Sequence, residues 1–382
     1  MKNHSPLRAV VFVGAAWGLF LLAAAPARAE GLGRTWAKLA ETHALKIGYF
    51  GGSITNGTGA SNPAQTSWRA LTTAWFRKQF PGAKITEVNA AIGGTGSDLG
   101  AFRCQHDLLG EQPDLVFVEF AVNDAGAPDS RASYYEGIVR QILKANPAAD
   151  IVPVYTVNKG SDSYPQGQVP HAVAYEQKIA DAYGLPSVNL GKALSQAIQD
   201  GKGTWETFTK DTTHPNDDGY RIYAATMADF LQAHRDDAAE PAAELPAPLN
   251  PSPVDSPSMV DAWTVDAPGW TQENESLGGR FPHRLAAQAP GTELTLPFAG
   301  TGIGLYWLFA PDSGIADYAI DGGPWKAVSS WDSYALQYTR ANASMLADNL
   351  PPGDHVLHLK IEDKKPGQST GTWVRIGAFL VR

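Results

Sequence analysis

Residues 45–56 read LKIGYFGGSITN, an apolar run that ends in two glycines and a serine. A run that is apolar nearly throughout is typical of a parallel strand covered on both faces. The glycines allow the chain to turn sharply and to expose Ser53. Strand patterns follow at 84–91, 114–122, 150–157 and 186–190, several of them also apolar nearly throughout, with amphipathic helical patterns between them. This order predicts an α/β fold with a parallel sheet and helices on both faces.

The composition limits the classes of protein to which the chain can belong. The 382 residues are 43% hydrophobic and 10% aromatic, which excludes a disordered chain and favours about two domains. The formal charge is −9 and no basic block is present, so a nucleic-acid partner is not expected. The lone Cys104 excludes an intrachain disulfide and is expected to be buried.

The first 29 residues have the pattern of a signal peptide. A basic start with Lys2 and Arg8 precedes an apolar run at 9–25, and Ala27-Arg28-Ala29 forms an A-x-A cleavage site. We therefore expect an exported protein, periplasmic or extracellular, with no membrane segment in its mature form. A membrane anchor is the alternative, although the apolar run is short for a span.

A change in composition divides the rest of the chain. Residues 30–236 carry the alternating pattern, and its last helix is expected at about 218–234. Residues 237–258 are rich in proline, which predicts an extended, semi-rigid linker. Residues 259–382 contain short strand patterns separated by turn signals, so a β-sandwich is expected there.

Four loops of the first domain carry residues suited to chemistry, and each follows a strand or precedes the last helix. They contain Ser53, the glycines of Gly93-Gly94-Thr95-Gly96, Asn123, and Asp211 with His214. Loops of an α/β sheet meet at the carboxyl ends of its strands. Each motif alone also has an ordinary explanation, such as a glycine-rich turn or a helix-entry loop.

Taken together, the four loops resemble those of the SGNH (GDSL-like) hydrolase family, in residue type and in order. The resemblance implies a flavodoxin-like three-layer α/β/α fold and ester hydrolysis. Ser53 would be the nucleophile, His214 the base and Asp211 its partner. The backbone N–H groups of Ser53 and Gly94, with the Asn123 amide, would form the oxyanion hole. The family often has Gly-Asp-Ser in the first loop, whereas this chain has Gly52 at the Asp position.

Either of two glycines in the second loop could supply the backbone N–H that donates to the oxyanion. Counting from Asn89 favours Gly94, and Gly93 is the alternative. Three other side chains are candidate substrate contacts: Trp205, for which packing is favoured, Arg103, for which surface exposure is the equal alternative, and Trp331 in the β domain.

An exported serine esterase with a β-sandwich suggests a carbohydrate acetyl esterase, since the C-terminal segment is similar to the jelly-roll modules of carbohydrate-active enzymes. The expected substrate is an O-acetylated hemicellulose such as xyloglucan or xylan. The alternatives are a peptidoglycan O-acetylesterase, a lipase or thioesterase, and a non-catalytic glycan-binding protein.

Two further patterns are assigned no catalytic role. Gly367-Gln368-Ser369-Thr370-Gly371 matches the G-x-S-x-G elbow but lies between two strand patterns, where that motif has no strand-to-helix turn. His355 and His358 would point to opposite faces of a strand, so no metal site is expected. No cofactor is implied.

Overall fold

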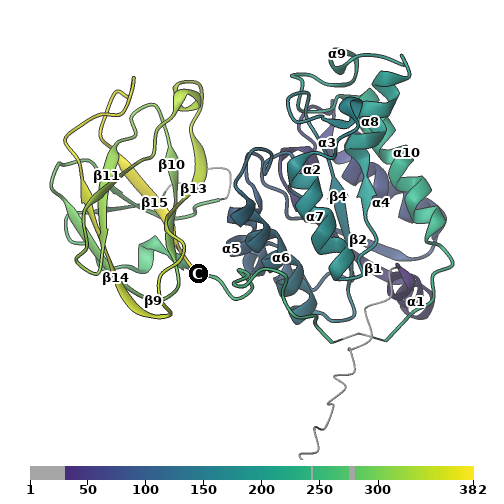
Figure 1. The fold of residues 1–382 in the computed structure, drawn as a ribbon, viewed down its shortest axis with the longest axis horizontal. Coiled ribbons are helices and arrows are strands. Elements are labelled where there is room, and N and C mark those ends of the chain that lie inside the picture. The colour runs from purple at the N-terminus through teal and green to yellow at the C-terminus, as the bar shows by residue number, and fades with distance from the viewer. Residues whose placement is uncertain (1–30, 242–243, 275–279) are drawn as a thin grey trace, which may run out of the picture.

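The computed structural model describes residues 31–241, 244–274 and 280–382. The predicted signal peptide, residues 1–29, lies outside the described residues. Within those residues, no helix has the length and apolarity needed to cross a bilayer. Two bodies lie side by side, an α/β domain and a β domain (Figure 1).

Helices and strands alternate through the α/β domain, as the sequence predicts. In chain order they are α1 (Gly33–Thr42), β1 (Ala44–Gly51), α2 (Ser53–Asn56), α3 (Pro63–Thr66), α4 (Trp68–Gln79), β2 (Lys84–Asn89), α5 (Ser97–Asp107), β3 (Leu115–Glu119), α6 (Ala132–Ala145), β4 (Asp150–Tyr155), α7 (His171–Ala182), β5 (Val188–Asn189), α8 (Leu190–Gln199), α9 (Trp205–Phe208) and α10 (Asp217–Ala233). Every expected strand is present, and the last helix lies where the pattern places it.

The five strands pair in parallel in the order β2-β1-β3-β4-β5. This is the flavodoxin-like order, in which the chain reverses direction across the sheet between β1 and β3. The prediction of a doubly wound parallel sheet is therefore confirmed. Its carboxyl edge carries the loops after β1, β2 and β3, and these loops contain Ser53, Gly94 and Asn123.

Two apolar cores cover the two faces of the sheet. Along β1, Leu45, Ile47 and Tyr49 belong to one core, and Phe50 belongs to the other. Helices α1, α4, α8 and α10 bury the first face, while α5, α6 and part of α7 bury the second. Strands covered on both faces explain the nearly continuous apolar runs.

The β domain contains two antiparallel sheets. Its strands are β6 (Ser258–Asp261), β7 (Thr271–Glu273), β8 (Arg284–Ala287), β9 (Glu293–Gly300), β10 (Ile303–Phe309), β11 (Ile315–Ile320), β12 (Lys326–Ser329), β13 (Arg340–Ala347), β14 (Gly353–Ile361) and β15 (Val374–Val381). One sheet has the order β13-β10-β15-β8-β7 with β6 beside β15, and the other has the order β12-β11-β14-β9. A separate apolar core lies between the two sheets, which confirms the β-sandwich.

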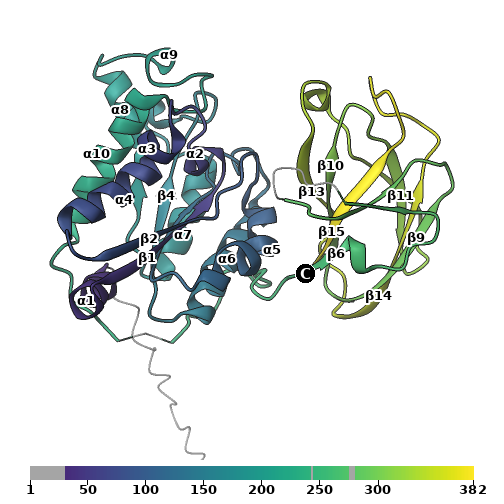
Figure 2. The same cartoon turned by 180° about the vertical axis from the view of Figure 1, so that it is seen from behind.

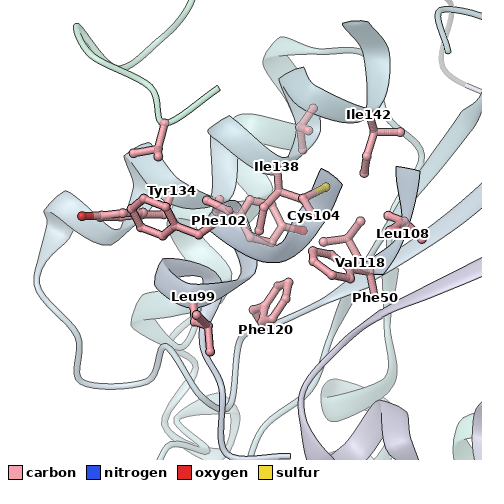
Figure 3. Close-up of a cluster of buried hydrophobic side chains, with 14 of the residues drawn as sticks. Phe50, Leu99, Phe102, Cys104, Leu108, Val118, Phe120, Tyr134, Ile138 and Ile142 are labelled. Carbon is pink, nitrogen blue, oxygen red and sulfur yellow. The ribbon is translucent and has the colours of Figure 1, made fainter. Parts of the chain in front are cut away.

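The β domain packs directly on α5 and α6 (Figures 1 and 2). One apolar core runs from the parallel sheet through these helices into the outer face of the six-stranded sheet. Figure 3 shows part of this core, in which Phe102 and Ile138 lie near the buried Cys104 and Tyr134 lies beside Phe102. The β-domain members of the core are Phe281, Tyr306, Leu308, Ala341, Ala378 and Leu380.

The proline-rich segment packs along α6. The buried Glu136 carboxylate accepts hydrogen bonds from the backbone N–H groups of Leu249 and Asn250, at 2.7 and 2.8 Å. Arg140 donates to Pro246 and pairs with Asp255. The segment is therefore fixed to the helix at several points, whereas the sequence pattern alone predicts a spacer.

Candidate active site

The nucleophile candidate lies at the junction of β1 and α2. Ser53 is the first residue of the short helix and is only 9% exposed. Gly52 precedes it in an extended conformation, and a Cβ atom there would overlap Oδ1 of Asn123. The close approach of Asn123 thus requires glycine at the position where the family often has aspartate.

Asp211, His214 and Ser53 form a continuous chain of short contacts. Nε2 of His214 lies 2.8 Å from Oγ of Ser53, and Nδ1 lies 2.7 Å from Oδ2 of Asp211. The His214 side chain is 21% exposed and that of Asp211 is 54% exposed. The structure therefore brings together three residues that the sequence places in two distant loops, in an arrangement suited to activating a serine hydroxyl.

The loop between α9 and α10 holds the imidazole in place. Oδ1 of Asp211 accepts hydrogen bonds from the backbone N–H groups of Thr213 and His214, at 3.1 and 2.8 Å. Partial burial opposes the charge of Asp211, but the donors from His214 and Thr213 outweigh it and hold the pKa of this carboxyl below its usual value. The carboxylate thus stays ionised beside the imidazole. Thr212 has a φ of 66°, so the backbone of this loop is held in the left-handed region.

The second and third loops border Ser53. A Cβ atom on Gly93 would lie 3.4 Å from Cβ of Ser53, so Gly93 faces the serine. Gly94 has a φ of 73° and open space around its Cα, consistent with a turn that favours glycine. The Asn123 carboxamide lies against Gly52. The three candidate oxyanion loops therefore surround one serine.

Asp124, which the sequence analysis did not single out, joins two of these loops. Its side chain is fully buried and accepts hydrogen bonds from the backbone N–H of Ser97, at 3.0 Å, and from the hydroxyl of Tyr175, at 3.0 Å. Arg131 pairs with it at 3.1 Å. Burial raises the pKa of Asp124 to about 6, although Arg131 opposes this effect. The sequence did contain a signal for this residue, because an acidic side chain directly after the apolar strand pattern is placed where it would be buried. A buried carboxylate needs hydrogen-bond partners, so it could have been expected to join neighbouring loops.

The structure places the three candidate substrate-contact residues in different surroundings. Arg103 is 2% exposed and its guanidinium binds backbone carbonyls inside the domain, so the structure corrects the expectation that it contacts substrate. Trp205 is buried and packs in the core that α10 covers. Trp331 is partly buried against the β-domain core and Gly367.

Exposed aromatic rings of the β domain lie just after Trp331. Tyr334 and Tyr338 are each more than half exposed, and the Arg340 guanidinium lies 5.6 and 5.9 Å from their ring centroids. Arg340 also pairs with Asp332 and packs on Phe309. This segment includes the 3₁₀ helix η5 (Ser333–Leu336), and it presents the rings to solvent beside a fixed cation.

Several other features lie outside the site. A pocket of about 560 Å³ opens at the amino ends of β1 and β2, lined by Lys46 and Lys84 among others, so it is at the opposite edge of the sheet. Ser369 is buried and donates to the Ser313 carbonyl at 2.6 Å between two strands. In the part of the chain that the structure describes, no group of His, Cys, Asp or Glu side chains is arranged to hold a metal ion.

Comparisons with known proteins agree with this architecture. Residues 49–222 match the model of the GDSL-like Lipase/Acylhydrolase family. A search of curated proteins gave no match. A two-domain esterase active on acetylated mannans is similar in structure, with a TM-score of 0.82 at 23% identity, covering 92% of this chain and 96% of that one. The same esterase co-crystallized with mannopentaose gives a TM-score of 0.81 at 23% identity, over 92% and 95% of the two chains.

A third similar structure is an acetylxylan esterase from Geobacillus stearothermophilus, with a TM-score of 0.40 at 19% identity over 49% of this chain and 94% of that one. The mannan-active esterase is similar across both domains, which shows a shared two-domain fold. Residues 49–222 of the α/β domain therefore match the model of the GDSL-like Lipase/Acylhydrolase family, and the whole chain shares its fold, an α/β domain followed by a β-sandwich, with the mannan-active esterase.

Proposed function

We propose that this protein is a serine esterase that removes O-acetyl groups from an acetylated hemicellulose. The observation that carries the proposal is the chain of contacts from Asp211 through His214 to Ser53, at 2.7 and 2.8 Å. Both distances are within hydrogen-bond reach, which proton transfer between nucleophile and base requires.

The reaction follows from the chemistry of these side chains. Oγ of Ser53 attacks the acetyl carbonyl carbon while its proton moves to Nε2 of His214. The imidazolium then gives this proton to the sugar oxygen, which leaves as an alcohol. Water deprotonated by His214 attacks the acetyl-serine, the imidazolium returns this proton to Oγ of Ser53 as the acyl–oxygen bond breaks, and acetate is released. Asp211 holds the imidazole in the required tautomer and favours its charged form.

The tetrahedral intermediate carries negative charge on the former carbonyl oxygen. We propose the N–H groups of Ser53 and Gly94 and the Asn123 amide as its donors, with Gly93 as the alternative to Gly94. The proximity of Gly93 to Ser53 and of Asn123 to Gly52 supports a donor set around this serine. One such donor typically contributes about 2.7–4 kcal/mol to transition-state stabilisation.

The glycan part of the proposal has two supports. The two-domain esterase with the same fold is active on acetylated mannans. In addition, Tyr334 and Tyr338 expose their rings beside Arg340. Aromatic faces stack on sugar rings, and a guanidinium donates hydrogen bonds to hydroxyl groups.

Acetate release from acetylated mannan, xylan and xyloglucan tests the proposal, with Ser53→Ala as the control. We expect release from at least one of these glycans and none from the variant. Preference for long acyl chains would instead indicate a lipase or thioesterase. Release from O-acetylated peptidoglycan alone would indicate a cell-wall esterase of bacteria. Binding of glycans without hydrolysis at any pH would indicate a glycan-binding protein.

We also propose that the protein is exported to the periplasm or beyond. The support is the basic, apolar and A-x-A order of residues 1–29. Expression with the full leader, followed by mass spectrometry of the exported fraction, is expected to give a chain that begins at Glu30. Retention of the whole chain in the membrane fraction would instead indicate an uncleaved anchor.

A further inference from the structure

A buried carboxylate lies directly beneath the turn that carries Ser53. Glu119 is the last residue of β3 and is 1% exposed. Its Oε2 accepts a hydrogen bond from the Thr55 hydroxyl at 2.8 Å, and its Oε1 accepts one from the Thr156 hydroxyl at 2.6 Å. The backbone N–H groups of Gly52 and Thr55 also face this carboxylate and act to lower its pKa. Glu119 thus binds the residues on both sides of Ser53.

A buried cation binds the same turn through the preceding carbonyl. Arg103, on α5, donates to the carbonyl oxygen of Gly51 at 3.0 Å and to that of Ala90 at 2.5 Å. Its guanidinium lies 4.3 Å from the ring centroid of Phe50, which limits its movement. Ala90 follows β2 and begins the segment that leads to Gly93 and Gly94. Arg103 therefore joins the nucleophile turn to the second loop.

We propose that Glu119 and Arg103 are positioning residues, which together fix the backbone of 51–55 so that Ser53 meets His214 and the oxyanion donors. This inference rests on the proposed esterase function. Neither side chain is exposed enough to bind substrate, so both act through Ser53.

The contacts explain how one turn can be fixed so tightly. The carboxylate accepts a hydrogen bond from the Thr55 hydroxyl, while the guanidinium donates to the carbonyl of Gly51. Donor and acceptor groups of the same short segment are thus each bound by a buried ion. Hydrogen bonds to charged groups are stronger than neutral ones. A glycine-rich turn needs such constraints, because its backbone is intrinsically free.

The burial of Glu119 and Arg103 is unfavourable for two charged side chains, which calls for a role other than packing. Burial raises the pKa of Glu119, and the hydrogen bonds from Thr156, Thr55 and Gly52 counteract this effect. Burial also lowers the pKa of Arg103. Burying an ion costs free energy, so a contribution to fold stability alone does not account for these two side chains. Because both side chains bind the segment 51–55, we infer that their role is to fix the geometry of this turn.

The test compares Glu119→Leu, which removes the acceptors, with Glu119→Gln, which keeps one acceptor oxygen and can donate to the Thr156 hydroxyl. Hydrolysis of p-nitrophenyl acetate gives kcat and KM, and labelling by a fluorophosphonate followed by mass spectrometry gives the reactivity of Ser53. We expect Glu119→Leu to lower kcat and the labelling rate about 10–100-fold with little change in KM, since a shift of about 1 Å can cost about a hundredfold. Glu119→Gln is expected to recover most of this loss.

Arg103→Lys keeps the charge but cannot bind two carbonyls as a planar fork, so it is expected to lower the same two rates about tenfold. The matched controls are Glu136→Leu and Arg140→Lys on α6. These side chains are also buried and bind backbone groups, but of the proline-rich segment. We expect the controls to reduce the melting temperature and to leave kcat and labelling within about twofold of the wild type.

Equal losses in the controls, or unchanged kcat and labelling in both folded Glu119→Leu and Arg103→Lys, would overturn the proposal. If Glu119→Leu does not fold, Thr55→Val removes one of its donors with little change in volume and Thr55→Ser restores it, so the pair gives the same comparison. A wild-type protein that is labelled at Ser53 but releases no acetate from any glycan would contradict the proposed substrate. The labelling rates of the variants would still decide the positioning role.

Discussion

Substitution of Gly52 by alanine tests how closely the nucleophile turn and Asn123 fit together. A Cβ atom at residue 52 would lie 3.1 Å from Cγ of Asn123 and would overlap its Oδ1. Ordinary contact between such atoms needs about 3.5 Å, so the carboxamide must move by about 1 Å or rotate away. Gly52 has a φ of −95°, which alanine adopts without strain, so the clash is with Asn123 alone.

The expected cost is that of one oxyanion donor, about 2.7–4 kcal/mol, which corresponds to a fall in kcat of about 100–1000-fold. Hydrolysis of p-nitrophenyl acetate is the assay. The KM of the variant is expected to stay within about threefold of the wild-type value, because the small acetyl group of this substrate contacts few protein groups before the reaction. Asn123→Ala is expected to produce a similar loss. The double variant Gly52→Ala/Asn123→Ala is then expected to lose no more than either single variant, because both remove the same donor.

Gly110→Ala is the matched control, since a Cβ atom there would meet only the Gln105 carbonyl oxygen, at 4.0 Å. It is expected to leave kcat unchanged. Wild-type kcat in Gly52→Ala, or a double variant whose loss equals the product of the two single losses, would refute this account of Asn123.

Three further predictions concern the triad, the buried acid and the domain contact. Ser53→Ala is expected to remove nearly all turnover and the phosphonate adduct while the melting temperature changes little; turnover near wild type would exclude Ser53 as the nucleophile. Asp124 has a pKa of about 6 in the folded protein against an ordinary value of 3.8, so the folded state retains its proton as pH rises between these values and loses about 3 kcal/mol of relative stability. The unfolding free energy of Asp124→Asn, measured between pH 4 and 6, should fall less steeply with pH than that of the wild type; equal slopes would contradict the raised pKa. Leu380→Ala is expected to lower the free energy of unfolding by about 2–5 kcal/mol with unchanged kcat, because this buried side chain belongs to the core shared by the two domains; a loss under about 1 kcal/mol in chemical denaturation would show that the contact contributes little.

The parallel sheet could be predicted because burial on both faces leaves a simple sequence signal. Most of its strands are apolar runs between helical patterns, and residues 115–119 are buried throughout, whereas the edge strand β2, KITEVN, has one buried residue. Strand β13 gave a weaker signal. Its sequence, RANASMLA, consists mostly of small or polar residues, and most of them are only half-buried. Short or half-exposed strands depend on their neighbours in the sheet more than on their own pattern.

The candidate site could be predicted in outline because topology gathers the carboxyl ends of parallel strands. Ser53 and Asn123 lie together for this reason, and His214 reaches Ser53 from the loop that precedes α10. Glu119 and Asp124 were missed, although each is a charged residue within or beside a buried strand. Their partners come from other elements, so only tertiary structure reveals them. The expectation for Arg103 was wrong because a position on a helix does not say whether a long side chain points out or in.

The relation between the domains depends on helix α6, which is buried on nearly all sides. Twelve of its 14 residues are buried, including Glu136, Arg140 and Gln141. A helix covered all round needs partners beyond a single sheet face. Here the parallel sheet covers one side, and the proline-rich segment and the β domain cover the rest, with Val254 packed against Gly137. The α/β domain alone would therefore expose apolar surface on α5 and α6, including the α5 residues that lie between the second loop and Arg103. By covering this surface, the β domain supports the helix layer beside the candidate site.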